Sequence, residues 1–235
     1  MVFKSKKDFL FLILACFFVT NAIVAEMISS KLIDIGPFTM IVGIIPWPVV
    51  FLSTDIINEF YGKSAVQRLS VITCCMIGYA FVILFIAMQI KTSPHSPASG
   101  EEFNKVFGNS LWVIVGSITA FLVSQVLDVR IFWLIRNLTG EKMIWLRSTG
   151  STVISQLIDS YVVLGIGFWL PGKFTFHEYM VIGITGYCFK LIIAVALTPV
   201  IYAMHGSIKR YLGEEAAEAQ IKHTAEESLH HRVDN

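Results

Sequence analysis

The sequence predicts an all-α integral membrane protein, a bundle of six transmembrane helices with both termini in the cytoplasm. The first observation is composition, because 55% of the 235 residues are hydrophobic and only 15% are charged. Mean hydropathy is +0.68, and a soluble domain of this length does not normally combine these values. The second observation is a series of long apolar runs. The third is an uneven distribution of lysine and arginine between the segments that connect them.

Six apolar runs are long enough to cross a bilayer. A transmembrane helix needs about 20 mostly apolar residues, and short polar segments containing Gly, Pro, Lys and Arg divide the runs. Helices are the expected spanning element because backbone groups in hydrocarbon must form their hydrogen bonds within the segment. The predicted spans cover residues 9–28, 38–57, 69–90, 111–135, 149–170 and 180–204.

The positive charges predict the orientation of this bundle. If the spans alternate in direction, one side of the membrane carries Lys4, Lys6, Lys7, Lys63, Arg68, Arg136, Lys142, Arg147, Lys209 and Arg210. The other side carries Lys31, Lys91, Lys105 and Lys173. By the positive-inside rule the richer side is cytoplasmic, which places both termini there. The net charge of +1 gives no reason to expect a nucleic-acid partner.

The chain divides into a six-helix transmembrane domain, residues 1–212, and a polar cytoplasmic tail, residues 213–235. The tail is expected to be either a short helix or a disordered end. The lysines before the first apolar run are also typical of a signal peptide. That run is longer than the usual hydrophobic region and no small-residue cleavage site closes it, so we interpret it as a helix. The loop at 91–108 is expected to contain a short interfacial helix in EEFNKVF.

Two further patterns concern packing. Pro46 and Pro48, in the sequence IPWP, lie inside the second predicted span. They are expected to kink it, either for packing or to open a substrate site. The four cysteines all lie within predicted spans and have neither metal-site nor disulfide spacing. We therefore expect no metal and no cofactor.

One short motif occurs twice. SQVLD at 124–128 and SQLID at 155–159 each place a serine, a glutamine and an aspartate inside a predicted span. Residues three and four apart share a face of a helix, so the polar side chains of each copy project the same way. Because successive spans are antiparallel, the two copies are expected to approach a common centre in opposite chain directions, as inverted repeats of transporters do.

Polar side chains within the spans are the candidate substrate-binding residues. A central aspartate costs about 2.5–3.5 kcal/mol on insertion scales, so such residues are expected to face the bundle interior, paired or lining a wet cavity. The candidates are Asn21, Asp55, Gln125, Asp128, Gln156, Asp159 and Lys190.

A structural interpretation of these residues stays open. Lys190 would then only neutralise an aspartate, while the amides and hydroxyls join the helices. The number of polar groups, which includes Glu59 one turn beyond Asp55, favours a solute pathway instead. Glu26 and Arg130 lie closer to span ends and are expected to reach the interface, so we leave them outside the site.

Several segments together resemble a known family. They are FLSTDIINEFYGK, SQVLDVRIFWLIR, STGSTVISQLIDS, and YCFK followed by TPVIY. In this order they resemble the queuosine precursor transporters of the vitamin uptake transporter family, over residues 21–202. The resemblance implies a six-helix inner-membrane importer of 7-deazaguanine bases, such as 7-cyano-7-deazaguanine, for queuosine synthesis in transfer RNA. Some members carry an acidic residue just before YCFK, in the position of Gly186.

The chemistry of the candidate residues is compatible with such a ligand. A carboxylate can accept hydrogen bonds from the ring N–H and the exocyclic amine of a guanine-like edge, and Asp128 or Asp159 is the first choice. The base carbonyl can accept from a lysine or an amide, and the candidate donors are Lys190, Gln125, Gln156 and Asn21. Phe189, Trp47 or Tyr187 would stack on the base.

Other functions are weighed against import. An intramembrane aspartyl protease would also use two aspartates on neighbouring helices, but the duplicated glutamines have no role in that chemistry. The substrate-binding membrane component of a larger ATP-driven vitamin importer would look similar and would need an energising subunit. A purely structural protein is a further alternative. The expected partners are a small-molecule base and membrane lipid, and homo-oligomerisation and the energy coupling stay open.

Overall fold

The computed structural model describes residues 5–29, 31–36, 38–108, 111–139 and 143–230, so Lys4 and Lys142 lie outside the described residues. The helices are α1 (Lys6–Met27), α2 (Trp47–Tyr61), α3 (Lys63–Gln89), α4 (Gly100–Phe107), α5 (Leu111–Thr139), α6 (Ile144–Leu164), α7 (Phe176–Ala196), α8 (Thr198–Leu212) and α9 (Glu214–His230). A hairpin of β1 (Leu32–Ile35) and β2 (Phe38–Ile41) precedes a 3-10 turn, η1 (Val42–Ile44). A π-helical turn, η2 (Gly165–Trp169), continues α6.

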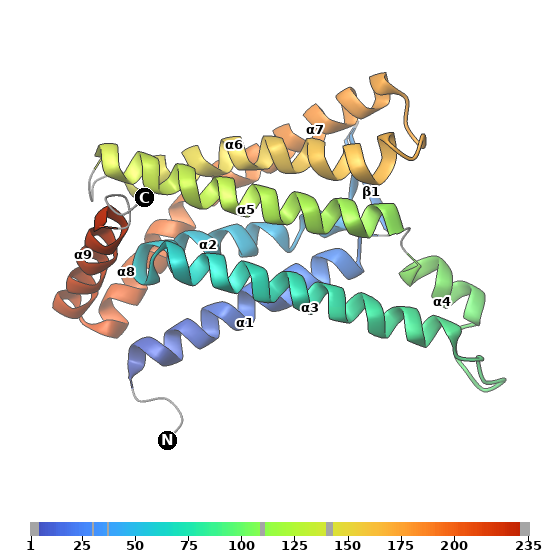
Figure 1. Ribbon diagram of the computed structural model, residues 1–235, viewed down its shortest axis with the longest axis horizontal. Helices are drawn as coiled ribbons and strands as arrows, with labels where there is room; N and C mark the ends of the chain where they lie inside the picture. Colours follow the sequence, from blue (N-terminus) through green and yellow to red (C-terminus); the bar gives the residue numbers. More distant parts are fainter. Residues whose placement is uncertain (1–4, 30, 37, 109–110, 140–142, 231–235) are drawn as a thin grey trace.

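The long helices form a bundle with two distinct ends (Figure 1). The start of α1, together with α8 and α9, gathers at one end, which we call the α9 end. The β-hairpin and α4 lie at the opposite end, the hairpin end. The short helix predicted in the long loop is confirmed as α4, which begins with a capping box between Ser99 and Glu102.

Five helical stretches among the described residues are long and apolar enough to cross a membrane: Lys6–Met27, Lys63–Gln89, the stretch that contains α5 (Leu111–Thr139), Ile144–Trp169 and Phe176–Ala196. They correspond to five of the six predicted spans. Large apolar side chains on their outer faces, such as Val82, Phe85 and Ile192, are more than half exposed. That exposure is expected where a helix faces lipid rather than water.

The prediction of one continuous helix over 38–57 is wrong. Residues 38–41 pair with 32–35 as an antiparallel hairpin, and α2 begins only at Trp47. Pro46 caps this helix and Pro48 lies in its first turn, so the prolines begin the helix instead of kinking it. A proline lacks the N–H that a first turn leaves unbonded in any case, which makes this the favourable position for it. With 15 residues, α2 is only about 22 Å long.

The turn η1, which connects the hairpin to α2, packs closely on α1. A β-carbon at Gly43 would lie 2.7 Å from the Ala25 carbonyl oxygen and 2.7 Å from the Ser29 hydroxyl, so only glycine fits between η1 and α1. This contact fixes where α2 starts relative to α1. The return pass of the chain between α1 and α3 is therefore made by a hairpin followed by a short helix (Figure 1).

The last predicted span, 180–204, is also divided. α7 ends at Ala196, and α8 begins at Thr198 with Pro199 in its first turn. Proline cannot donate the backbone hydrogen bond that would continue α7, which explains the break. The tail after Gly213 forms a helix, α9, and its Ala217, Ile221 and Thr224 side chains are buried.

The apolar core lies between α1, α2, α3 and α5. Phe18, Val50, Phe60 and Phe132 have no exposed surface, and the rings of Phe18 and Phe121 are 6.2 Å apart. This core holds one side of α2 against the bundle. The opposite side of α2 is free to carry polar residues toward α5, α6 and α7.

Candidate functional site

The polar site is organised by α2. Every residue from 52 to 60 is buried, although the stretch includes Thr54, Asp55, Asn58 and Glu59. Positions three and four apart lie on one face of a helix, so these four side chains form a single polar stripe. Buried polar groups are costly unless they have partners, so the elements that face the stripe define the site.

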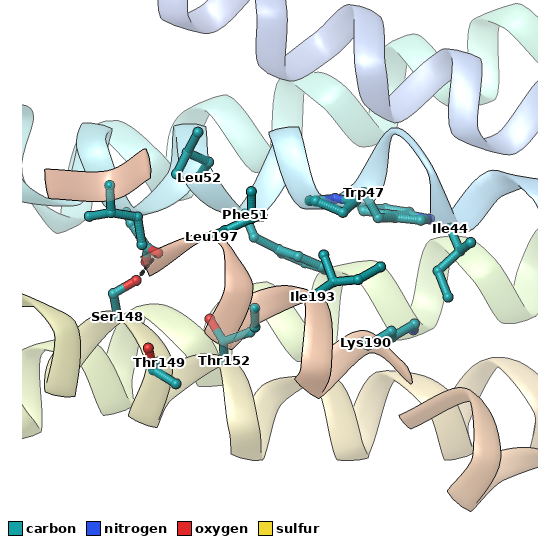
Figure 2. Close-up of a pocket in the computed structure, with 14 residues that line it drawn as sticks. Ile44, Trp47, Phe51, Leu52, Ser148, Thr149, Thr152, Lys190, Ile193 and Leu197 are labelled. Atoms are coloured by element: carbon teal, nitrogen blue, oxygen red, sulfur yellow. Dashed lines mark hydrogen bonds between the residues drawn. The ribbon is translucent and has the colours of Figure 1, made fainter. Parts of the chain in front are cut away.

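A pocket lies between α2, α6 and α7 (Figure 2). Trp47, Phe51 and Asp55 line it from α2, and the rings of Trp47 and Phe51 are stacked at 5.8 Å and 19°. Lys190 and Ile193 line it from α7. We call it the central pocket. It contains about 440 Å³ of empty space including its open mouth.

Small hydroxyl side chains of α6 form the remaining wall. Ser148, Thr149 and Thr152 line the central pocket, and the Ser148 hydroxyl donates a short hydrogen bond to Asp55 Oδ2 (Figure 2). The second oxygen of Asp55, Oδ1, is buried and has no hydrogen-bond partner in the part of the chain that the structure describes. A carboxylate with one free oxygen beside an aromatic pair can accept hydrogen bonds from a planar ligand.

Lys190 joins the pocket to the repeated motif. Its Nζ lies 2.6 Å from Asp159 Oδ2, and both side chains are about 85% buried. Asp159 also accepts a hydrogen bond from Ser124 at 3.3 Å. The ammonium therefore has one protein carboxylate and also faces the central pocket, so it can neutralise Asp159 and donate to a ligand in the same place.

The two motif copies contact each other reciprocally. Ser155 of the second copy donates to Asp128 of the first at 3.0 Å, while Ser124 of the first donates to Asp159 of the second. The predicted approach of the copies is confirmed in these contacts. Of the two glutamines, Gln125 donates to Thr54 at 3.4 Å, and the Oε1 atoms of Gln125 and Gln156 are both buried without a partner.

A charged layer follows one turn further along α2. Glu59 Oε1 accepts from Arg147 at 2.6 Å, and Glu59 Oε2 lies 4.0 Å from Arg136 Nη1. His205 of α8 lies 3.9 Å from the same carboxylate. Arg136 and Arg147, which the sequence analysis counts among the charges of the predicted cytoplasmic side, are 3% and 1% exposed. Their burial has a simple cause, since Glu59 is buried and needs opposite charge.

Two residues differ from expectation at the first helix. Asn21 donates to the Phe17 carbonyl one turn back at 2.8 Å, and does not line the central pocket. Glu26, expected at the interface, is instead 6% exposed and accepts from Ser117 at 2.5 Å. Arg130 is exposed as expected. Glu26 therefore belongs to the buried polar set that the sequence analysis left out.

Sequence reasoning missed the hydroxyl wall of α6 and the stacking partner of Trp47. The spacing of Ser148, Ser151 or Thr152, and Ser155 is three to four residues, which is a polar helical stripe that the sequence already contained. Phe51 carries no such signal, because one aromatic among many apolar residues looks like core. Phe189 and Tyr187, proposed as stacking residues, do not line the central pocket.

An apolar multi-helix bundle with a pocket between its helices, lined mainly by apolar side chains and reached by a buried carboxylate and an ammonium, is typical of a solute transporter. A family model described as "Putative vitamin uptake transporter" matches residues 41–204. The match covers more than half of the chain, and the chain belongs to this vitamin uptake transporter family. The family is one of transporters and not of enzymes, and the chain is a multi-pass protein of the inner membrane.

Three curated relatives are similar over most of the chain. A "Probable queuosine precursor transporter" of Bacillus subtilis is 26% identical over 76% of this chain and 77% of its own length. A "Queuosine precursor transporter" of Escherichia coli is 27% identical over 65% and 66%. A third, from Haemophilus influenzae, is 25% identical over 66% and 63%. No solved structure matches the chain.

Proposed function

We propose that this protein imports queuosine precursors, 7-deazaguanine bases such as 7-cyano-7-deazaguanine, across the inner membrane for queuosine modification of transfer RNA. The observation that carries the proposal is the match to known proteins, since the chain belongs to the vitamin uptake transporter family. The relatives that it matches are named for queuosine precursors. The buried polar groups of the central pocket support it independently.

The central pocket offers complementary chemistry for a guanine-like base. The base would stack on Trp47 or Phe51 where these rings line the pocket, since aromatic rings favour offset stacking. Asp55 would accept from the ring N–H and the exocyclic amine, and Lys190 would donate to the carbonyl. Asp55 is thus a better candidate for the ligand carboxylate than Asp128 or Asp159, because of the three only Asp55 is among the described residues that line the central pocket.

The remaining candidates act around this contact. Gln125 and Gln156 hold buried carbonyl oxygens without partners, and Asp128 and Asp159 organise the two motif copies. Asn21 would contribute only if α1 moves. The closed part of the pocket has room for about one water molecule, about 20 Å³. Binding a bicyclic base therefore requires Ile193 or the helix α7 to move away from α2, and a carrier must make such a change in its transport cycle.

The proposed topology has six passes with both termini in the cytoplasm. Its support is the arrangement of the ends, because α1 starts at the same end of the bundle where α8 and α9 lie (Figure 1). Lys6, Lys7, Lys209 and Arg210 are at that end as well. The positive-inside rule then makes the α9 end cytoplasmic. The hairpin and α2 together make the second pass.

The test is queuosine content of transfer RNA in cells that cannot make the precursor. They are supplied with 7-cyano-7-deazaguanine in the medium, with and without this protein. The wild type restores queuosine, whereas Asp55→Asn and Trp47→Ala lose it at equal membrane abundance. Thr73→Val is the matched control, because Thr73 is buried on α3 and its hydroxyl donates to the Leu69 carbonyl of its own helix. Unchanged queuosine in Asp55→Asn would refute the assigned carboxylate.

A second arm distinguishes the modes of import. Purified protein in liposomes accumulates or equilibrates labelled base by itself if it is a self-sufficient carrier. If base enters only with a copurified energising subunit, the protein is instead the substrate-binding membrane component of a larger ATP-driven importer. Uptake with and without a proton gradient then separates active from facilitated transport.

A further inference from the structure

A second cavity lies at the α9 end of the bundle, beyond the central pocket. Its volume is about 230 Å³, far more than the closed part of the central pocket. Glu59, Arg147, Tyr202 and His205 line it from α2, α6 and α8. Its lining is therefore polar and of mixed charge, and can offer both donors and acceptors to a heterocyclic base.

The two cavities follow each other along the same helices. Asp55 lines the central pocket and Glu59 lines the second cavity, one turn further on α2. On α6, the neighbours Ser148 and Arg147 line the central pocket and the second cavity respectively. The second cavity thus lies on the path from the central pocket to the α9 end.

A thin barrier separates the cavities. Leu52 and Ile201 line the central pocket, Ile144 lines the second cavity, and the three side chains form one small buried cluster. The ion pair between Glu59 and Arg147 lies beside this cluster, with both residues 1% exposed. A buried ion pair adds little net stability compared with well-packed apolar residues. Both residues of the pair line the second cavity, next along α2 and α6 to Asp55 and Ser148 of the central pocket, so the pair can form part of a barrier between the cavities.

The helix α9 forms the outer wall of the second cavity through Glu218 and Ile221. Thr224 donates to the Glu59 carbonyl at 3.2 Å, and Arg136 donates to the Ile221 carbonyl at 2.9 Å. Lys7 donates to Gln220 at 2.6 Å. The tail is therefore tied to one residue of the barrier, Glu59, and a movement of α2 at this residue would also move α9.

We propose that the second cavity is the station from which the solute leaves at the α9 end, and that Leu52, Ile144, Ile201 and the Glu59–Arg147 pair form the gate between it and the central pocket. This inference rests on the proposed import of a base, because it assigns the route of that solute. In the present structure the gate is closed and the cavity on the release side is the larger one.

The gate is tested without any solute by thiol labelling. In a variant with all four cysteines replaced, Thr149→Cys reports on the central pocket and Tyr202→Cys on the second cavity. A membrane-impermeant methanethiosulfonate is added to right-side-out or to inside-out vesicles. We expect Tyr202→Cys to react from the face where the termini lie, and Thr149→Cys to react slowly from that face.

Opening the gate should change the labelling rate of Thr149→Cys in the central pocket and leave that of Tyr202→Cys unchanged. In Ile144→Ala/Ile201→Ala, Thr149→Cys should react about tenfold faster from the α9 face, as when the open state gains about 1.4 kcal/mol. Glu59→Gln/Arg147→Gln, which leaves neither charge of the pair uncompensated, is a second gate variant in case the first is poorly inserted. Equal rates in all backgrounds, or Tyr202→Cys reacting only from the opposite face, would overturn the gate.

A separate experiment tests whether the solute occupies the second cavity. Added 7-cyano-7-deazaguanine should slow the labelling of Tyr202→Cys in a background that still imports the base. No protection there would overturn the station. Failure of the proposed function is distinguishable, since the wild type would then import no base while the gate variants still change the labelling of Thr149→Cys.

Discussion

Ser155 of α6 donates a hydrogen bond to Asp128 of α5 at 3.0 Å, and the motif copy that holds Asp128 returns the contact through Ser124 and Asp159. The two contacts are equivalent in sequence but differ in surroundings. Asp128 is 6% exposed, whereas Asp159 also has the ammonium of Lys190. The two serines therefore differ in their expected importance.

Ser155→Ala should destabilise the protein more than Ser124→Ala. Removing a hydrogen bond to a buried charged group costs about 1.5–3 kcal/mol, and Asp128 would lose its 3.0 Å donor and keep the neutral hydroxyl of Ser151. Asp159 keeps Lys190 when Ser124 is replaced, so that loss should be smaller. Thermal unfolding of the purified variants in one detergent measures the difference. Equal losses would contradict the asymmetry.

Asp159 and Lys190 should be strongly coupled. Either single replacement, Asp159→Asn or Lys190→Gln, leaves one mostly buried charge without its partner, which costs about 3–5 kcal/mol for a fully buried pair. The double variant should recover most of that stability. Base uptake then shows whether Lys190 also binds the base. If Lys190 only neutralises Asp159, the double variant also recovers uptake, and if Lys190 binds the base, it stays inactive.

Two glycines of α7 form a matched pair. A β-carbon at Gly183 would lie 2.6 Å from the ring of Tyr161, whereas at Gly186 it would meet nothing within 4 Å. Gly183→Ala should therefore force α6 and α7 apart and cost about 1–3 kcal/mol, the usual range for overpacking. Gly186→Ala should be neutral or slightly stabilising, because alanine is the better helix former. The melting temperatures of the two variants give the comparison.

Acid should destabilise the α9 end through His205. Burial, with Lys209 and Arg147, lowers the pKa of His205 below its usual value of 6.5, and Glu59 opposes this only in part. As pH falls below 6.5, the unfolded state binds the proton first, so stability is lost with decreasing pH until the folded-state pKa is passed. His205→Gln should remove this part of the dependence. His95→Gln in the exposed loop is the control, and unfolding between pH 7.5 and about pH 5 measures both.

The sequence alone determined the class of the molecule and most of its spans. Long apolar runs and internal carboxylates have few other physical explanations, because hydrocarbon admits neither unpaired backbone nor unpaired charge. Five predicted spans have counterparts among the membrane-length helices. The reciprocal contact of the motif copies was also predictable, since antiparallel neighbours bring equal motifs together. The family resemblance is confirmed by the match over residues 41–204.

The break of the second span depended on tertiary structure. IPWP is compatible with a kink or with a helix start, and the choice is made by the contact of Gly43 with α1. The same holds for Arg136 and Arg147. A basic residue near a span end is expected at the surface. Arg136 and Arg147 are buried instead, because a buried carboxylate from another helix, Glu59, lies next to them.

The sequence therefore determined which polar residues lie within the membrane, because each of them occupies a position inside a long apolar segment. Only the tertiary structure decided which of them meet. Asp55 lines the pocket with Ser148, while Asp159 pairs with Lys190. In the sequence alone, Asp55, Asp128 and Asp159 look equivalent. The physical reason is that pairing depends on the rotation and depth of whole helices. Those are set by distant contacts such as the hairpin on α1 and α9 on α2.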